Sequence, residues 1–429
     1  MRTGTDRISD RRRAGGQGTD NGVDKDRRHM GGRTAGSRRL SGRESGRRGK
    51  RRGNFRLNTR WKRQLSFTGV SARILMSVLA GLLVMSFLSV VINPGKVWIF
   101  AVFGLLFLPL FIVNLVLFLW ALKRRSRSFV IPLAALLPSV FFIGGYFQLP
   151  SSERPGTPAE GEETVRLVSY NVGRFLQSHG RNMPEGRRAC SDSIRHFLTE
   201  QNADIICLQE FYTTDIGRVR QYLSGWLKGY RAEYYFYRSR YGYYGNVTFS
   251  RMRARDKGVI HFDNSANLAI YTDYTYKGKS FRVYNCHFES YNISTTGLLR
   301  SVHRRDREML RETETKVRRG LAQRPRQVSR VLKHIAGSPV ESFVCGDFND
   351  TPMSYTYYRL SKGRDDSFRK AGEWFGATFS FLWPLLRIDY VLYPEEFRAI
   401  SHRTPHRPYS DHYPVVTEIS LTAPDGSGG

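Results

Sequence analysis

Three polar residues follow one short apolar run in the segment FVCGDFND, residues 343–350. The run FVC ends at a glycine, and Asp347, Asn349 and Asp350 come within the next four positions. Asp and Asn are common in turns because their side chains bond nearby backbone groups. The same side chains also present oxygen atoms that suit a hard metal ion. Both interpretations fit this segment alone, so the rest of the chain has to distinguish them.

Similar polar residues stand at or near the ends of several other predicted strands. Taken singly, an Asp or Asn after a strand is most often a turn residue, and a lone His in a strand is most often a core residue. Asp389 differs, since an acid between Ile388 and Tyr390 is expected to be buried and to need a partner, for which His412 is the candidate. The full set is Asn171, Glu210, His287, Asp347, Asn349, Asp389, Asp411 and His412.

These residues need a fold that brings several strand ends together. After about residue 164 the chain alternates short strands, such as VRLVSYN and ADIICLQE, with amphipathic helices. Cys190, Ile194 and Phe197 recur at helical spacing between those two strands, and a basic helical stretch runs from Thr296 to about Ile335. A solvated helix face is the default for that stretch. The pattern predicts an α/β domain.

The segments SYNV, CLQEF, CHFES, CGDFNDTP, RIDYVL and YSDHYPV resemble, in order and approximate spacing, the endonuclease/exonuclease/phosphatase superfamily. The resemblance covers residues 165–421, and GDFND together with SDHYPV is its most specific part. It implies a four-layer α/β sandwich, in which two packed mixed β-sheets are flanked by helices, as in pancreatic-type deoxyribonucleases. It also implies a phosphoric ester hydrolase that uses Mg²⁺ or Mn²⁺.

The resemblance implies a role for each residue of the set. Glu210 is expected to be the principal metal ligand, helped by Asn171 and by Asp411. The expected catalytic residues are His287, Asp347, Asn349, Asp389 and His412, of which His287, Asn349 and His412 also contact the substrate phosphate. Asp347 orients or deprotonates the attacking water, and Asp389 fixes the imidazole of His412, which is either a general base or a phosphate ligand.

Strand geometry adds a prediction of its own. Asp347 and Asn349 are two positions apart, so on an extended strand end their side chains point to the same side. Asp350 then points away, and we expect it to turn the chain before Thr351 and Pro352.

The chain before this domain has a different composition. Residues 1–68 are rich in Arg, Gly and Ser, and the first 63 of them hold 21 Lys and Arg against 6 acids, about half of the formal net charge of +31. Such a segment buries too little apolar surface to fold, so we predict a disordered tail. A solvated flank of a membrane segment is the favoured interpretation, and weak binding to anionic lipid or nucleic acid is the alternative.

Three uncharged stretches follow the tail, at about residues 74–92, 97–122 and 129–149. Each has about the 18–20 residues that cross the hydrocarbon core as a helix. Buried helices of a soluble core would show a polar face, and these show none. We therefore predict three transmembrane helices over residues 69–149, and contact with a lipid bilayer through them.

The distribution of Lys and Arg predicts the orientation. The basic tail and the loop Lys123–Arg127 are expected on the cytoplasmic side. Three crossings then place a linker (150–164), the catalytic domain (165–421) and a flexible end (422–429) outside the cytoplasm. The chain is predicted to be an integral inner-membrane protein with a periplasmic catalytic domain, and its arrangement resembles a membrane-anchored branch of the superfamily common in Bacteroidetes-type bacteria.

The sequence does not decide which substrate the domain acts on. A nuclease-like phosphodiesterase, either endonuclease or exonuclease, is the first hypothesis. A phospholipid-, sphingomyelin- or sugar-phosphate-directed phosphatase or phosphoesterase is the second, and a catalytically inactive membrane-tethered scaffold the third. The Tyr- and Arg-rich segment 229–255 either stacks nucleic acid bases or packs as strand surface. The four cysteines show no metal-site or disulfide spacing, and Cys207, Cys286 and Cys345 are expected to be buried free thiols.

Overall fold

The computed structural model describes residues 67–150, 158, 160–176, 184–291 and 307–422. The predicted tail, except for its last two residues, lies outside the described residues, as do most of the predicted linker and residues 423–429.

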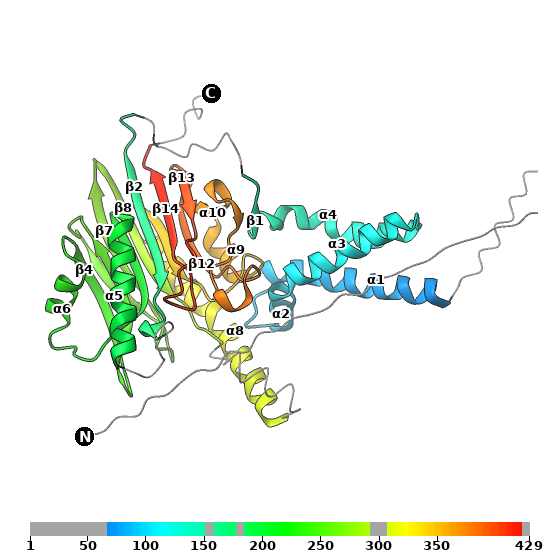
Figure 1. Cartoon of the computed structure of the whole chain (residues 1–429), viewed down its shortest axis with the longest axis horizontal. Helices are drawn as coiled ribbons and strands as arrows, with labels where there is room; N and C mark the ends of the chain where they lie inside the picture. Colours follow the sequence, from blue (N-terminus) through cyan, green and yellow to red (C-terminus); the bar gives the residue numbers. More distant parts are fainter. Residues whose placement is uncertain (1–66, 151–157, 159, 177–183, 292–306, 423–429) are drawn as a thin grey trace, which may run out of the picture. The chain divides into compact units, whose positions relative to one another are not determined.

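Two six-stranded β-sheets form the centre of the domain (Figure 1). One sheet has the strand order β10-β12-β9-β8-β7-β6, and the other β13-β14-β2-β3-β5-β4. Strands β2 and β3 pair in parallel, as do β8 and β9, whereas the other pairs are antiparallel. The strands are β2 (Thr164–Asn171), β3 (Ile205–Thr213), β4 (Arg231–Ser239), β5 (Gly242–Ser250), β6 (Lys257–His261), β7 (Leu268–Tyr276), β8 (Lys279–His287), β9 (Glu341–Asp347), β10 (Arg364–Asp366), β12 (Asp389–Pro394), β13 (Arg398–Arg403) and β14 (Val415–Ser420).

Three apolar layers hold the domain together. The inner faces of the two sheets pack against each other through residues such as Phe281 and Val415. Helices α5 (Pro184–Gln201) and α6 (Val219–Trp226) cover the outer face of one sheet, and α8 (Arg307–Ala336) and α9 (Tyr355–Ser361) cover that of the other. The prediction of two mixed β-sheets flanked by helices is confirmed. The remaining elements are η3 (Gly173–Phe175), α10 (Ser367–Ala371), β11 (Trp374–Phe375) and η4 (Ser380–Leu382).

The Tyr- and Arg-rich segment forms the hairpin of β4 and β5, with most of its tyrosines on partly or fully buried strand positions. The structure therefore favours strand packing for this segment. None of the four cysteines forms a disulfide and all four are buried, as predicted for three of them.

The apolar segments differ from the prediction in their continuity. Helix α1 (Phe67–Phe87) runs into η1 (Leu88–Val90), and residues Gly69–Val90 are long and apolar enough to cross a membrane. The second predicted span is bent by 62° between α2 (Ile99–Leu105) and α3 (Phe107–Lys123). The described part of the chain thus has one helix that meets the criteria for a span, or two if the bent pair crosses as one.

The predicted third span, residues 129–149, is wrong in its last part. It begins with η2 (Arg127–Phe129) and α4 (Val130–Ile143), and the helix ends before Gly144. Two successive glycines weaken a helix because they lose the most backbone entropy when they are ordered. Beyond them β1 (Phe147–Gln148) pairs with β11, so this end of the segment belongs to a small sheet and not to a helix.

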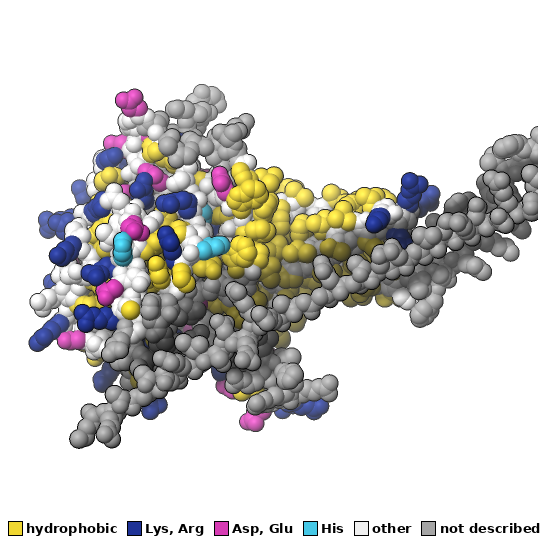
Figure 2. All heavy atoms as spheres, in the orientation of Figure 1, with side chains coloured by type: hydrophobic (Ala, Val, Ile, Leu, Met, Phe, Trp, Pro, Cys, Tyr) yellow, Lys and Arg dark blue, Asp and Glu magenta, His cyan; other side chains and the backbone are white. Residues whose placement is uncertain are grey.

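The apolar helices and the domain share contacts near the segment that opened the sequence analysis. Met353 packs into the apolar cluster of α1, α3 and α4. Its carbonyl accepts a hydrogen bond from Ser89 Oγ (2.7 Å), and its N–H donates to Tyr146 Oη (3.3 Å). Buried Arg387 donates to the Gly145 carbonyl (3.0 Å). Figure 2 shows hydrophobic side chains along these helices.

Candidate active site

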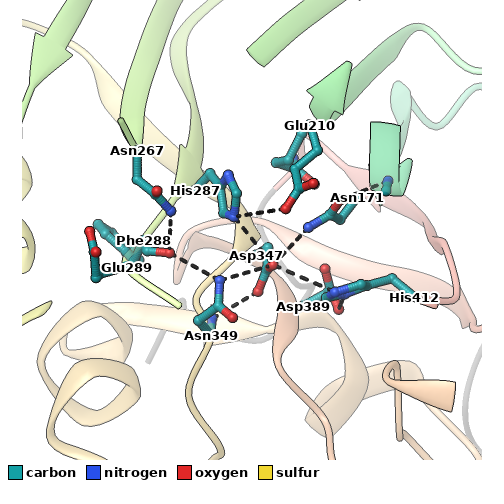
Figure 3. A network of polar contacts seen from close by, with 12 residues as sticks. Asn171, Glu210, Asn267, His287, Phe288, Glu289, Asp347, Asn349, Asp389 and His412 are labelled. Atoms are coloured by element: carbon teal, nitrogen blue, oxygen red, sulfur yellow. Dashed lines mark hydrogen bonds and ion pairs between the residues drawn. The ribbon is translucent and has the colours of Figure 1, made fainter. Parts of the chain in front are cut away.

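Asp347 lies at the centre of a buried polar network, at the end of β9 (Figure 3). In the sheet register it stands between His287 at the end of β8 and Asp389 at the start of β12. The other sheet supplies Asn171 from the end of β2 and Glu210 from β3. Residues from both sheets therefore meet here, most of them at strand ends as predicted. The sequence predicts that Glu210 ends its strand, but β3 continues to Thr213, so Glu210 lies within the strand.

Two amide side chains hold the Asp347 carboxylate in place. Asn171 Nδ2 donates to Oδ2 (2.9 Å), and so does Asn349 Nδ2 (3.1 Å), while the Asn349 backbone N–H donates to Oδ1 (2.8 Å). Asn349 reaches this position with φ of 51°, a left-handed conformation that Asn tolerates better than most residues. Asp347 and Asn349 thus do act together, but through a turn and not through an extended strand end.

Asp389 and His412 form the predicted pair. His412 Nδ1 lies 2.9 Å from Asp389 Oδ2, and both residues are buried. Burial opposes the charged imidazole, but Asp389 and then Asp347 hold the pKa of His412 well above its ordinary value. His412 Nε2 is 3.8 Å from Asp347 Oδ2, so the imidazolium faces the central carboxylate.

His287 and Glu210 lie on the other side of Asp347. His287 Nε2 is 3.7 Å from Asp347 Oδ2 and 3.9 Å from Glu210 Oε1. Burial lowers the pKa of His287, although Asp347 works in the opposite direction, so this imidazole is neutral at pH 7. Glu210 sits where the pairing of β3 with β5 is irregular, with φ of 52°, and its carboxylate pairs with Arg174 (3.0 Å). A bulge of this kind re-aims a side chain.

The two other acids of the motifs lie outside this network. Asp411 Oδ1 accepts from Ser410 Oγ (3.3 Å) and lies beside Gly173. Asp350 points away from the centre, as predicted, but it is more than a turn residue, because its carboxylate pairs with the buried Arg324 of α8 (3.0 Å).

Sequence reasoning missed three neighbours of the site. Arg174 pairs with Glu210, and its only sequence signal is its place three residues after Asn171. Thr378 Oγ1 accepts from the Asp389 N–H (3.0 Å), and the ring of Phe379 packs on His412 at 5.2 Å between centroids. Neither belongs to a recognisable motif.

The family model described as "Endonuclease/Exonuclease/phosphatase family" matches residues 168–412, more than half of the chain. The chain belongs to the endonuclease/exonuclease/phosphatase family. A second model, "Domain of unknown function (DUF8431)", matches residues 70–146, the apolar helices. No curated protein matches the chain.

Solved structures similar to this member of the endonuclease/exonuclease/phosphatase family include three of low sequence identity. An endonuclease/exonuclease/phosphatase from Beutenbergia cavernae is 17% identical, with 60% of this chain and 72% of that chain covered and a TM-score of 0.45. One from Bacteroides vulgatus is 17% identical over 61% and 100% of the two chains, with a TM-score of 0.43. A humanized TDP2 of D. rerio is 16% identical over 60% and 99%, with a TM-score of 0.44.

The centre of this family member has donors that fit a hard divalent cation. Asp347, Asp389 and His412 bring three potential ligand atoms within 4.8 Å of one another, although His412 in the protonated form described above cannot bind a metal ion. Among the described residues, two buried atoms of the centre, His287 Nε2 and Asp389 Oδ1, have no hydrogen-bond partner. Carboxylate and amide oxygens are the ligands that Mg²⁺ and Mn²⁺ prefer. The predicted ligand set of Glu210, Asn171 and Asp411 differs from this group of three and stays a prediction.

The raised pKa of Asp347 predicts how the stability of the folded chain depends on pH, which can be measured without a substrate. Burial, and then the neighbouring Asp389, raise its pKa from 3.8 to about 6. Between these values the folded state binds more protons than the unfolded state, so the contribution of Asp347 to the free energy of unfolding falls as the pH rises from 4 to 6. The neutral variant Asp347→Asn should therefore unfold at a higher temperature than wild type at pH 8 and not at pH 4, by roughly 2–4 °C per kcal/mol gained.

Thermal unfolding of the full chain in detergent with EDTA, followed by circular dichroism, measures this difference. Glu395→Gln, on the exposed turn between β12 and β13, is the control and should leave the unfolding temperature unchanged at both pH values. An equal shift for Asp347→Asn at pH 4 and pH 8 would show that its carboxyl group is not perturbed.

Proposed function

We propose that this chain is a divalent-metal-dependent phosphoesterase that hydrolyses phosphodiester or phosphomonoester bonds by water attack. The observation that carries the proposal is the buried centre in which Asp347 stands between two imidazoles and the Asp389–His412 pair is in hydrogen-bond contact. Membership of the family supports a phosphoric ester hydrolase in general.

Asp347 is suited to accept a proton from the attacking water. With a pKa raised to about 6, its carboxylate is ionised at pH 7 yet is a stronger base than an ordinary Asp. The amides of Asn171 and Asn349 fix its orientation, so that one geometry is available for the transfer.

His412 is suited to hold charge. Of the two roles expected for it, general base and phosphate ligand, the raised pKa favours the second, since a protonated imidazole cannot accept a proton. The imidazolium offers a charged donor to a phosphate oxygen, or a proton to the leaving oxygen. Neutral His287 lies across Asp347 and offers a further contact to the phosphate.

A divalent cation, when bound, supplies neutralisation of charge on the phosphate oxygens and a lower pKa for its bound water. Glu210, with Asn171 and Asp411, would hold it, while Arg174 positions the Glu210 carboxylate.

Replacing Glu210 tests the proposal at the residue expected to hold the cation. Purified full chain, freed of metal with EDTA and resupplied with Mg²⁺ or Mn²⁺, is assayed on bis-p-nitrophenyl phosphate, plasmid DNA, RNA and sphingomyelin. Glu210→Ala should lower turnover about 10–100-fold or more, in line with the loss of a metal-site residue. Glu395→Ala, on the exposed turn between β12 and β13, is the matched control. Absence of turnover on all four substrates would support the scaffold hypothesis instead.

We further propose that the apolar helices anchor the chain in the inner membrane, with the N-terminal tail in the cytoplasm and the catalytic domain in the periplasm. The apolar helix Gly69–Val90 and the basic residues Lys123–Arg127 support this orientation. A reporter that is active only in the cytoplasm should be silent when it is fused after Gly429. Reporter activity at that position would contradict the orientation.

A further inference from the structure

Five large apolar side chains are exposed on the segment 374–383, although they belong to the folded domain. We call them the aromatic lip. Between 40 and 56% of the surface of each is accessible. A soluble surface rarely leaves a contiguous group of this kind in water, and such groups mark contact with another apolar phase. The members are Trp374, Phe375, Phe381, Leu382 and Trp383.

The aromatic lip is joined directly to the active site. Phe379, two residues before Phe381, forms an isolated β-bridge with His412, and its ring packs on the His412 ring at 5.2 Å. The next residue, Ser380, donates its backbone N–H to the Asp411 carbonyl (2.8 Å). The lip therefore borders the side of the centre that carries His412.

The aromatic lip is also joined to the apolar helices. Strand β1 begins four residues after the end of α4 and pairs with β11, which carries Trp374 and Phe375. The ring of Phe147 packs on Phe375 at 5.2 Å, and Phe375 packs on Trp383 at 6.1 Å. One continuous row of side chains thus leads from the end of α4 to the lip.

The helices at the other end of this row are themselves apolar on their exposed faces. Ile74 of α1 and Phe141 of α4 have 60 and 77% of their surfaces accessible. Figure 2 shows hydrophobic side chains continuing from these helices onto the adjoining edge of the domain. Trp and other aromatic residues favour the boundary between hydrocarbon and water. This continuity favours a lipid surface over a soluble partner as the phase that the lip contacts.

We propose that the aromatic lip lies in the membrane interface and that the active site hydrolyses phosphate esters in the headgroups of membrane lipids. The inference rests on the proposed function and names its substrate class. All five members of the lip are uncharged and apolar, so the lip itself offers no charge to the phosphates of a nucleic acid.

The reaction is an ordinary hydrolysis of one P–O bond of the headgroup. The oxygen of water bonds to phosphorus while one of its protons passes to the Asp347 carboxylate. The bond to the leaving oxygen breaks, and that oxygen takes a proton from solvent. Asp347 then gives its proton to solvent, so no other reactant is required.

The substrate class is tested with full chain in nanodiscs of phosphatidylethanolamine, phosphatidylglycerol and cardiolipin, with Mg²⁺. Wild type should release products from a lipid of the disc. The double variant Phe381→Ser/Leu382→Ser should lower this lipid turnover about ten-fold or more, because two large side chains lose their apolar contact. Its turnover of soluble bis-p-nitrophenyl phosphate should stay within about two-fold of wild type, since neither side chain belongs to the catalytic centre. Ile216→Ser/Tyr241→Ser, also exposed apolar residues, is the matched control.

The outcomes separate this inference from the proposed function. Turnover of bis-p-nitrophenyl phosphate, DNA or RNA without hydrolysis of any disc lipid overturns the inference and leaves the phosphoesterase intact. Absence of turnover on every substrate overturns both. Equal loss on the lipid and on the soluble ester shows that the lip supports the catalytic centre and does not select lipid.

A second measurement tests the placement of the aromatic lip without any activity. All four natural cysteines are buried, so a nitroxide label at Leu382→Cys can be attached selectively. In nanodiscs this label should collide more often with oxygen than with a polar nickel reagent, and a label at Ile216→Cys should show the reverse. Equal access of the nickel reagent to both labels would contradict contact between the lip and lipid.

Discussion

Replacing Asp347 by alanine is expected to lower kcat/KM on bis-p-nitrophenyl phosphate by about 10³-fold, within the 10²–10⁴ range of a positioned proton acceptor. The loss has two causes, and both follow from removal of the Asp347 carboxylate. The variant has no base for the attacking water, and the amides of Asn171 and Asn349 lose the acceptor that orders them. The loss should appear mainly in kcat, because the substrate phosphate itself contacts other groups.

Two controls make this result interpretable. Asp263→Ala removes an exposed carboxylate and should keep the wild-type rate. Asp347→Asn keeps the shape of the side chain and removes only the base, so it should lose nearly as much activity as the alanine variant. If Asp347→Ala kept more than about a tenth of the wild-type kcat/KM, a role as proton acceptor would be excluded.

Asp389→Ala and His412→Ala are expected to lose similar amounts of activity, about 10²–10³-fold each, and the double variant should lose little more than either one. The reason is the direct contact of 2.9 Å between the two side chains. Without Asp389, the imidazole loses the carboxylate that raises its pKa. Without His412, the Asp389 carboxylate no longer has an imidazole to orient. Initial rates of the wild type, both single variants and the double variant form the thermodynamic cycle.

Loss of one partner also leaves a buried charge unpaired, which costs about 3–5 kcal/mol in other proteins. The circular dichroism spectrum of each variant must therefore match that of wild type before its rate is compared. The Asp389→Asn variant, which keeps the shape at this position, provides a second route if alanine unfolds the domain. Losses that multiply in the double variant would show that the two residues act independently.

The polar strand ends could be predicted because apolar runs reveal where strands end, and eight residues were named on that basis. Seven of them contact one another in a single polar centre. Asp411 lies beside this centre, next to Gly173. The sequence could not show that Asp347 and Asp389 stand opposite each other in neighbouring strands, because register depends on long-range pairing. The bulge that aims Glu210 is hidden for the same reason.

Long-range partners account for the other differences. Asp350 has the sequence of a turn residue, but Arg324, 26 positions earlier in α8, makes it half of a buried ion pair. The C-terminal half of α8, expected to be a solvated basic face, packs on the domain through residues such as Val328 and Val331. Hydropathy alone located the apolar helices, but it could not place the bend between α2 and α3 or the end of α4 before Gly144.

The most direct test of the proposed function is the rate at which the purified full chain hydrolyses bis-p-nitrophenyl phosphate after removal of metal with EDTA and again after addition of Mg²⁺. We predict no turnover in EDTA, turnover that saturates as Mg²⁺ is added, and no recovery for Asp347→Ala at any Mg²⁺ concentration. A rate that is the same with EDTA and with Mg²⁺, or an Asp347→Ala protein as active as wild type, would contradict the assignment of this centre as a metal-dependent phosphoesterase site.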